Sequence, residues 1–249
     1  MRSITILTYH SLDPSGSVVS VQPDMFSSQM ASLAAIHHRC ISLQEALDFR
    51  QAHQNWPPNS TILTFDDGYR NLYDYALPVL NELKFRATVF VITGHIGGYN
   101  DWSKLPPGMQ RKEMLSWEQI VALQDAGIEI GAHTDCHPDL RRIDAAQMDH
   151  ELSESREQLE DRLKRQVRTF AYPFGSLNRT VVTAAASYFQ AACTTELRRA
   201  SEHPLHRLPR VDMYYFRNCN DLRPVVHGSL DSLLLCRRWA RRLKELLAN

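Results

Sequence analysis

The chain has 249 residues, 43% of them hydrophobic, and no low-complexity tract, so it is long enough to bury the core of one domain. Its 28 Lys and Arg residues balance 28 Asp and Glu residues, so net charge gives no indication of a nucleic acid or another acidic polymer as a partner. No apolar run approaches the roughly 18 residues of a membrane span, and five scattered cysteines argue against a disulfide framework.

The first predicted element is a strand at residues 4–8, which continues into Tyr9 and His10. The start of the chain is too short and too mixed in polarity for a signal peptide, so we expect a cytoplasmic protein. One helix is predicted from Pro23, and a second from a capping box at Ser42 through about residue 50. His10 directly follows a strand, where barrel enzymes gather catalytic groups if their strands are parallel.

A buried strand at residues 61–65 ends in two adjacent carboxylates, Asp66 and Asp67, and then in Gly68. Adjacent carboxylates repel one another, so they require either full solvation or a cation that neutralises them. Taken alone, this stretch is compatible with a solvated Asp-Asp-Gly turn and with a cation site.

Residues 69–84 have a mostly helical pattern in which Pro78 marks a break or a fresh helix start, and residues 87–92 form the next buried strand. The segment at residues 94–110 is rich in Gly, Pro and Asn, which predicts a long loop at the carboxyl end of that strand. Its Tyr99 and Trp102 can stack on a sugar ring, although aromatic residues in a loop are just as often packed locally.

Two histidines follow the strand predicted at residues 128–132. His133 and His137 are separated by three residues, a spacing that allows both imidazoles to reach one metal ion. Together with the Asp-Asp pair, they predict a metal site with two His ligands and one Asp ligand. Cys136 lies between them and is a softer ligand, but three protein ligands are already available, so we expect Cys136 not to bind the metal.

The remaining elements continue the alternation of strands and helices. We expect a long helix with a solvated charged face at residues 144–165, a strand with a tight exit at 168–175, a helix at 178–187, and strands at 188–194 and 206–212. This alternation predicts parallel βαβ units. About seven strands fit either a barrel or an open sheet, which periodicity does not separate.

The last stretch, residues 229–248, has the pattern of a leucine-rich helix. The leucines Leu230, Leu233, Leu234 and Leu243 have the spacing of a buried stripe, so we expect this helix to dock on the preceding domain. A basic amphipathic helix can also lie on an anionic membrane, which would place the protein at the inner face of that membrane. The basic residues of this stretch are Arg237, Arg238, Arg241, Arg242 and Lys244.

Two motifs carry a resemblance to a known family. Thr-Phe-Asp-Asp-Gly at residues 64–68 and His-Thr-Asp-Cys-His at residues 133–137 resemble the first two motifs of the polysaccharide deacetylases, the NodB-homology or carbohydrate esterase family 4 group. The resemblance extends from Ile4 to about Asp212. It implies a single incomplete (β/α)7-type barrel, formed by residues 1–228, with residues 229–249 as the docked basic helix.

The resemblance also assigns roles in the site. It makes Asp67, His133 and His137 the metal ligands and Asp66 the general base that takes a proton from water. The third family motif, usually Arg-x-Pro-Tyr, is similar to Ala-Tyr-Pro-Phe at residues 171–174, which makes the Phe174 backbone N–H the oxyanion donor.

Two of the family's groups have no direct match in this chain. The Arg of the third motif is absent, and we expect Arg210 to orient Asp66, although a strand-end Arg is more often part of a surface ion pair. The family's usual carboxyl-terminal His is not well matched, although His227 is available. Tyr9-His10 instead resembles the circularly permuted branch that includes exopolysaccharide poly-N-acetylglucosamine deacetylases, so we expect His10 to be the general acid.

The resulting hypothesis is a metal-dependent N-deacetylase that hydrolyses the acetamido group of an N-acetylated sugar and releases acetate. Its substrate would be a polysaccharide or a lipid-linked glycan precursor, and its metal Zn²⁺, although the same ligands also bind Fe, Co or Ni. Two alternatives stay open. One is a hydrolase of a non-sugar amide or an O-acetyl ester at the same site, and the other is a catalytically silent carbohydrate-binding or assembly module.

Overall fold

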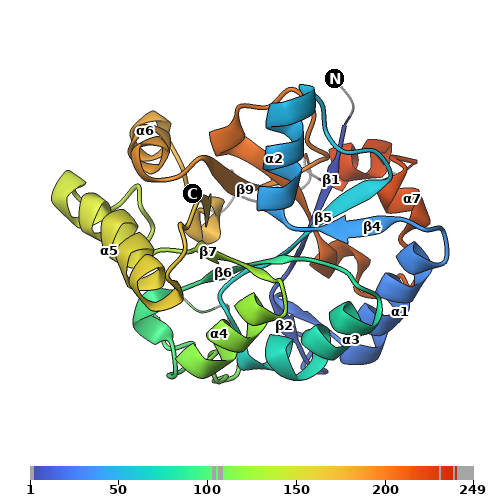
Figure 1. Ribbon diagram of the computed structural model, residues 1–249, viewed down its shortest axis with the longest axis horizontal. Helices are drawn as coiled ribbons and strands as arrows, with labels where there is room; N and C mark the ends of the chain where they lie inside the picture. Colours follow the sequence, from blue (N-terminus) through green and yellow to red (C-terminus); the bar gives the residue numbers. More distant parts are fainter. Residues whose placement is uncertain (1–2, 103–104, 106–108, 230, 238, 240–249) are drawn as a thin grey trace.

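The computed structural model describes residues 3–102, 105, 109–229, 231–237 and 239. In it, parallel strands form a closed ring surrounded by helices (Figure 1). The ring closes where the first strand pairs with both the fifth and the tenth. This arrangement confirms the predicted (β/α)7-type barrel. The seven ring strands are β1 (Thr5–Tyr9), β5 (Ser60–Phe65), β6 (Thr88–Val91), β7 (Glu129–Ala132), β8 (Thr169–Ala171), β9 (Ala191–Leu197) and β10 (Leu208–Asp212).

A further strand, β4 (Arg39–Ile41), supplements the ring at one end. It pairs with residues 60–62 at the start of β5, whereas β6 pairs with the end of β5, at Thr64 and Phe65. Just before β6 in the chain, the Arg86 N–H donates to the Cys40 carbonyl at 2.9 Å. On this side of the ring, β4 is therefore the neighbour of β5 at the amino end of β5, and β6 is its neighbour at the carboxyl end.

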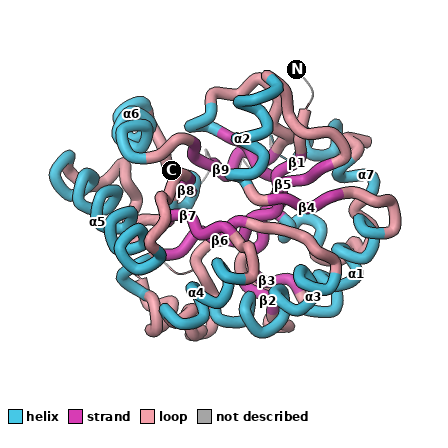
Figure 2. Tube along the Cα trace, viewed as in Figure 1, coloured by secondary structure: helices cyan, strands magenta, loops and turns pink. Residues whose placement is uncertain are grey.

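Helices cover the outside of the ring (Figure 2), and their apolar residues face it. Phe26, Met30 and Leu33 have helical spacing in the first helix and are fully buried against the barrel. The helices are α1 (Pro23–Ala34), α2 (Leu43–His53), α3 (Leu77–Glu82), α4 (Trp117–Asp125), α5 (Ala145–Leu163), α6 (Arg179–Tyr188) and α7 (Arg223–Val226).

Side-chain caps fix where several helices begin. Ser116 and Asp144 each form a complete capping box, with Gln119 and Gln147 respectively. The capping box predicted at Ser42 is only half formed. Its hydroxyl accepts from the Glu45 N–H, but the Glu45 carboxylate pairs with Arg39.

Short elements account for the remaining differences from the prediction. The ribbon of β2 (Ser11–Leu12) and β3 (Ser20–Val21) was not expected. The π-helical turn η1 (Leu72–Ala76) runs directly into α3, so of the two roles predicted for Pro78 the structure confirms the start of a helix. Helix α6 continues to Tyr188, so the strand expected from residue 188 begins later. Single 3₁₀ turns are η2 (Thr93–His95), η3 (Pro173–Gly175), η4 (Leu205–Arg207) and η5 (Met213–Phe216).

The carboxyl-terminal segment is helical at residues 231–237 and 239. Leu234 is buried in the main core, whereas Leu233, Leu235 and Trp239 are exposed. Leu230, Leu243, Arg238, Arg241, Arg242 and Lys244 lie outside the described residues, so docking of the whole segment and its membrane contact stay predictions.

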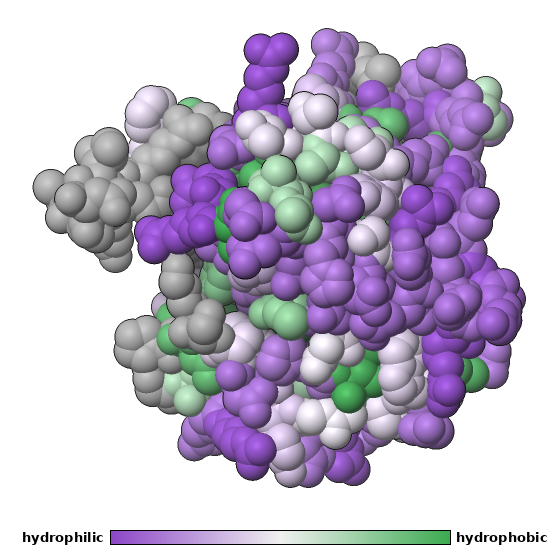
Figure 3. Space-filling view, turned by 90° about the vertical axis from the view of Figure 1, so that its left-hand side faces the viewer, coloured by the Kyte–Doolittle hydropathy of each residue, from purple (hydrophilic) through white to green (hydrophobic). Residues whose placement is uncertain are grey.

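Within the described part of the chain, no helix combines the length and the apolar character needed to cross a membrane. The face in Figure 3 is mostly hydrophilic, with its hydrophobic residues in small, separate areas.

Candidate active site

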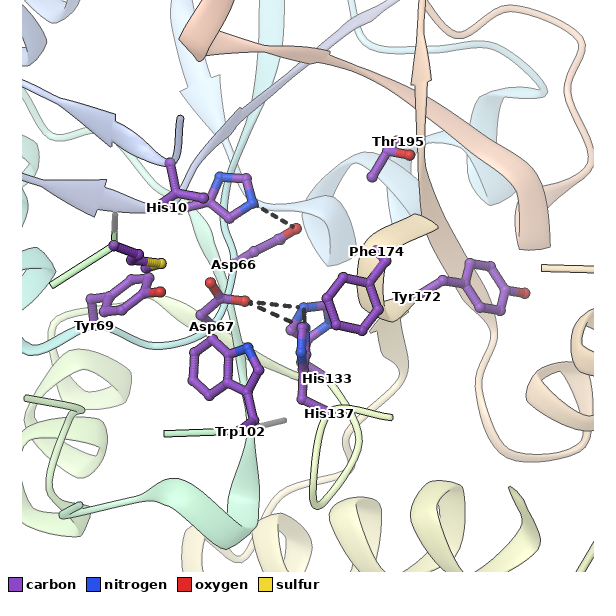
Figure 4. Close-up of a pocket in the computed structure, with 12 residues that line it drawn as sticks. His10, Asp66, Asp67, Tyr69, Trp102, His133, His137, Tyr172, Phe174 and Thr195 are labelled. Atoms are coloured by element: carbon purple, nitrogen blue, oxygen red, sulfur yellow. Dashed lines mark hydrogen bonds and ion pairs between the residues drawn. The ribbon is translucent and has the colours of Figure 1, made fainter. Parts of the chain in front are cut away.

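The predicted site residues meet at the carboxyl end of the barrel. His10 follows β1, Asp66 and Asp67 follow β5, His133 follows β7, and Phe174 lies in η3 just after β8. Parallel strands bring their carboxyl ends to the same edge, so residues far apart in sequence line one pocket (Figure 4). The pocket is lined by His10, Val19, Asp66, Asp67, Tyr69, Trp102, Met109, His133, His137, Tyr172, Phe174 and Thr195.

Asp67, His133 and His137 form a buried triangle. The Asp67 Oδ1 atom lies 3.3 Å from His133 Nε2 and 3.7 Å from His137 Nε2, and the two Nε2 atoms are 3.2 Å apart. Ligand atoms at about 2.0–2.1 Å from one tetrahedral ion would be about 3.3 Å apart. The three side chains therefore have the spacing that a tetrahedral metal ion requires.

The Nδ1 hydrogen bond of His133 and the low pKa of His137 also suit a metal. His133 Nδ1 lies 2.8 Å from the Ala171 carbonyl, to which it donates, so that Nε2 faces the centre of the triangle with its lone pair. Burial and the neighbouring His133 lower the pKa of His137 to about 3, so this ring is neutral, as a metal ligand must be. Burial would also lower the pKa of His133, but its bond to Asp67 raises it by more.

Unusual backbone angles aim these ligands at one another. Asp67 has φ 71°, Thr134 has φ 67° and His137 has φ 57°, all in the left-handed region that side chains rarely adopt. Thr134 Oγ1 accepts from the His137 N–H at 3.0 Å and so closes the turn between the two histidines. Strained positions of this kind cluster at functional sites, where the surrounding structure maintains them.

Asp66 and Arg210 form a buried, bidentate ion pair. The two guanidinium nitrogens lie 2.7 Å and 2.6 Å from the two carboxylate oxygens, and both side chains are almost fully buried. Burial alone would raise the pKa of Asp66, but Arg210 holds it below its usual value. Arg210 is thus inside the barrel rather than in a surface ion pair, and it both orients Asp66 and keeps it ionised.

Of the two candidate histidines, only His10 reaches this pocket. Its Nε2 lies 3.9 Å from Asp66 Oδ2, and the Asp66 N–H donates to the Tyr9 carbonyl, which ties the ends of β1 and β5 together. His227 follows α7, where its ring faces that of His38 at a centroid distance of 6.1 Å.

Phe174 borders the pocket in a left-handed conformation, with φ 58° and ψ 4°. Its ring lies 4.5 Å from that of His137 and is 41% exposed, so it forms part of the rim. The next residue must be a glycine, because a Cβ on Gly175 would lie 2.0 Å from Thr195 Oγ1. This close contact fixes the turn that brings Phe174 to the metal ligands.

The two aromatic residues of the long loop have different surroundings. Trp102 is buried, and its ring lies 4.9 Å from that of His137. Tyr99 is covered by the guanidinium of Arg111, 3.3 Å from the ring centre, so this face is not available to a sugar. Cys136 is exposed, and its thiol donates to Asp135 and does not join the ligand triangle.

Sequence reasoning missed several residues of the pocket wall. Tyr69 directly follows the Asp-Asp-Gly motif, which was a usable signal; its hydroxyl is buried and has no hydrogen-bond partner among the described residues. Val19 and Met109 come from separate loops and Thr195 from β9, and they gave no signal, because only the fold brings them together.

Comparisons with known proteins agree with this geometry. The family model described as "Polysaccharide deacetylase" matches residues 53–190. The Bacillus subtilis (strain 168) protein named "Putative polysaccharide deacetylase YxkH" is 29% identical over 210 residues, which cover 82% of this chain and 70% of that protein.

Two further relatives are similar over much of the chain. A Staphylococcus aureus (strain MSSA476) poly-β-1,6-N-acetyl-D-glucosamine N-deacetylase is 29% identical over 168 residues, 64% of this chain and 55% of that protein, so the match spans about half of the relative. The structure of the Streptococcus pyogenes deacetylase PplD in complex with acetate has a TM-score of 0.74 and 26% identity, and the match covers 85% of this chain and 92% of that one.

Proposed function

This chain belongs to the polysaccharide deacetylase family, and we propose that it removes acetyl groups from N-acetylated sugar residues with the help of a bound divalent metal ion. One observation carries the proposal. The Asp67–His133–His137 triangle lies beside the Asp66–Arg210 pair in a single pocket, so a metal site and an ionised, fixed base face the same space.

The proposed chemistry is hydrolysis of an amide. A metal ion held by Asp67, His133 and His137 would polarise the substrate carbonyl and make a bound water more acidic. Asp66 takes a proton from the attacking water, and His10 gives a proton to the departing nitrogen as the C–N bond breaks. The Phe174 N–H donates to the carbonyl oxygen as negative charge develops on it. The products are acetate and a free amino sugar.

The size of the pocket supports a small acyl group. Its volume is about 110 Å³. This space accommodates an acetamido group and the attacking water, while the sugar ring stays at the rim near Phe174. The name of the S. aureus relative supports β-1,6-linked N-acetylglucosamine oligomers as the first substrate to test, and a lipid-linked glycan as the second.

The test is acetate release, measured together with the appearance of free amines. Zn²⁺-loaded protein is incubated with N-acetylglucosamine oligomers, small N-acetyl amides and O-acetyl esters. We expect acetate and amine in equal amounts from the oligomers, and a rate about 10²–10⁴ lower for Asp66→Asn. Asp161→Asn, on the exposed face of α5, is the control and should keep full activity.

Other outcomes would separate the alternatives. Faster turnover of the small amides would identify a non-sugar amidase, and release of acetate from the esters alone would identify an esterase. Failure to hydrolyse any substrate, with Zn²⁺ bound and the protein folded, would contradict an enzymatic role and favour the silent binding module.

A further inference from the structure

Glu151, on α5, contacts the loop that joins the two proposed histidine ligands. One of its carboxylate oxygens, Oε2, accepts from the Asp135 N–H at 2.9 Å and from the Cys136 N–H at 2.8 Å. Asp135 and Cys136 are two of the three residues between His133 and His137. The Glu151 side chain is buried, although the pattern of α5 had predicted a solvated charged face.

The same loop is also held by η2 and by a second residue of α5, Gln158. The Asp135 carboxylate accepts from Thr93 Oγ1 at 2.7 Å and from Gln158 Nε2 at 3.2 Å, and the Asp135 carbonyl accepts from the Gly94 N–H at 2.9 Å. A Cβ on Gly94 would lie 2.8 Å from that carbonyl, so the two segments are in direct backbone contact. The loop is therefore held by hydrogen bonds to both η2 and α5.

The loop needs support from neighbouring residues because its backbone conformation is strained. Thr134 and His137 both have positive φ, and residues other than glycine rarely adopt this region without support from their surroundings. The two consecutive N–H groups of Asp135 and Cys136 also converge on one carboxylate oxygen, so its removal would break both hydrogen bonds at once. A carboxylate is a stronger acceptor for both than a neutral group.

We propose that Glu151 is a positioning residue of the metal site. By holding the Asp135 and Cys136 N–H groups, it sets the turn that places the two Nε2 atoms 3.2 Å apart. This inference rests on the proposed metal-binding function. Residues that orient metal ligands without touching the metal change the metal affinity by about 10- to 100-fold. The effect of replacing Glu151 should therefore be measurable as a change in metal affinity, in an experiment that requires no turnover.

Three substitutions separate geometry from charge. Glu151→Ala removes the acceptor, and Glu151→Asp keeps the charge but withdraws the oxygen by one methylene. Glu151→Gln can keep both bonds, because a single oxygen accepts them and the amide carbonyl can take its place. Glu157→Ala, an exposed position on the same helix, is the matched control.

The experiment is a competition for Zn²⁺ between each metal-stripped protein and a chromophoric chelator, with circular dichroism to verify folding. We expect affinity to fall about 10- to 100-fold in Glu151→Ala and about tenfold in Glu151→Asp. Glu151→Gln should stay within about threefold of the wild type, since its hydrogen bonds remain. Glu157→Ala should match the wild type.

The outcomes distinguish this inference from the proposed function. If the wild type binds no Zn²⁺, the metal site itself is wrong. If the wild type binds Zn²⁺ and folded Glu151→Ala and Glu151→Asp bind it equally well, the site stands and the role of Glu151 is refuted. Should Glu151→Ala not fold, Glu151→Asp alone decides, because it preserves the charge and the helix.

Discussion

Arg210 supplies from β10 the positive charge that the third motif lacks at Ala171. Two strands of the ring, β1 and β10, lie next to each other, so a side chain within β10 reaches the base at the end of β5 through the barrel interior. A guanidinium holds a carboxylate through two parallel bonds, which fixes the orientation as well as the charge of Asp66. An arginine can therefore serve this role from a different strand.

Removing Arg210 should destabilise the protein strongly. Arg210→Met leaves Asp66 as a buried, unpaired carboxylate, and we expect the free energy of unfolding to fall by about 3–5 kcal/mol. Denaturant titration measures this change. The double variant Asp66→Asn/Arg210→Met should be more stable than the sum of the single effects predicts, because it leaves no unpaired charge. Additive effects would show that the two side chains do not depend on each other.

The two candidate general acids can be distinguished by matched substitutions. His10→Gln should lower kcat by about 10²–10⁴, because it removes the proton donor beside Asp66. His227→Gln should leave kcat unchanged, because His227 packs near His38 and does not line the pocket. Steady-state kinetics on the same oligomer gives both values. The reverse result would mean that the circularly permuted arrangement does not apply to this chain.

At the scale of elements, an ion pair joins the β2–β3 ribbon to the long loop beside the pocket. Asp13, just after β2, accepts from Lys112 at 2.7 Å, from Ser11 at 2.5 Å and from Ser20 at 2.9 Å. The ribbon contributes Val19 to the pocket wall. The position of one wall of the pocket thus depends on a single carboxylate.

The contribution of Asp13 to stability should depend on pH. Burial would raise its pKa, but Lys112 and the neighbouring hydroxyls hold it well below the usual range. A lowered pKa stabilises the folded state above the unfolded pKa of about 4, and this contribution is lost as the pH falls towards the folded pKa. Asp13→Asn should therefore have a lower Tm than the wild type at pH 7, and the difference should shrink below pH 4.

Thermal unfolding at several pH values tests this prediction, with Asp161→Asn as an exposed control whose Tm should follow the wild type. A difference for Asp13→Asn that stays constant between pH 7 and pH 3 would mean that its charge is not responsible.

Elements with many local contacts could be predicted from the sequence, and those defined by distant contacts could not. The helix start at Ser42 and the strand before Asp66 have local signals that the structure confirms. Strand β4 has three residues and β2 and β3 have two each, so their existence depends on partners elsewhere in the chain. Glu151 was read as a solvated charge because periodicity records polarity and does not show which loop covers a helix.

The same limit applies to the site. The three residues proposed as metal ligands could be predicted to share one site because two local motifs contain them, and the structure brings these residues together. The closure of the barrel followed only from the family resemblance. The aromatic loop gave a mixed result, since Trp102 lines the pocket while Tyr99 is covered by Arg111.

At the scale of the whole molecule, the proposed metal ion would connect the ends of β5 and β7, which lie on either side of β6. These ligands come together only in the folded barrel, so binding should stabilise it. At a free Zn²⁺ concentration of 100 Kd the expected gain is about 2.7 kcal/mol. The Tm of metal-stripped protein should therefore rise when Zn²⁺ is added and fall again with excess chelator.

His137→Ala should remove most of this rise, whereas His150→Ala, an exposed histidine on α5, should keep it. An equal rise in His137→Ala would place the bound Zn²⁺ elsewhere on the protein.

The pairing of β1 with both β5 and β10 also has a consequence for synthesis on the ribosome. Translation delivers His10, Asp66 and all three proposed metal ligands well before Arg210. At roughly 5–20 residues per second, Asp66 waits on the order of 10 seconds or more for the arginine that fixes it. A nascent chain that stops short of β10 therefore carries the residues proposed as ligands, base and acid but cannot close its barrel, and we expect it to lack the proposed deacetylase activity.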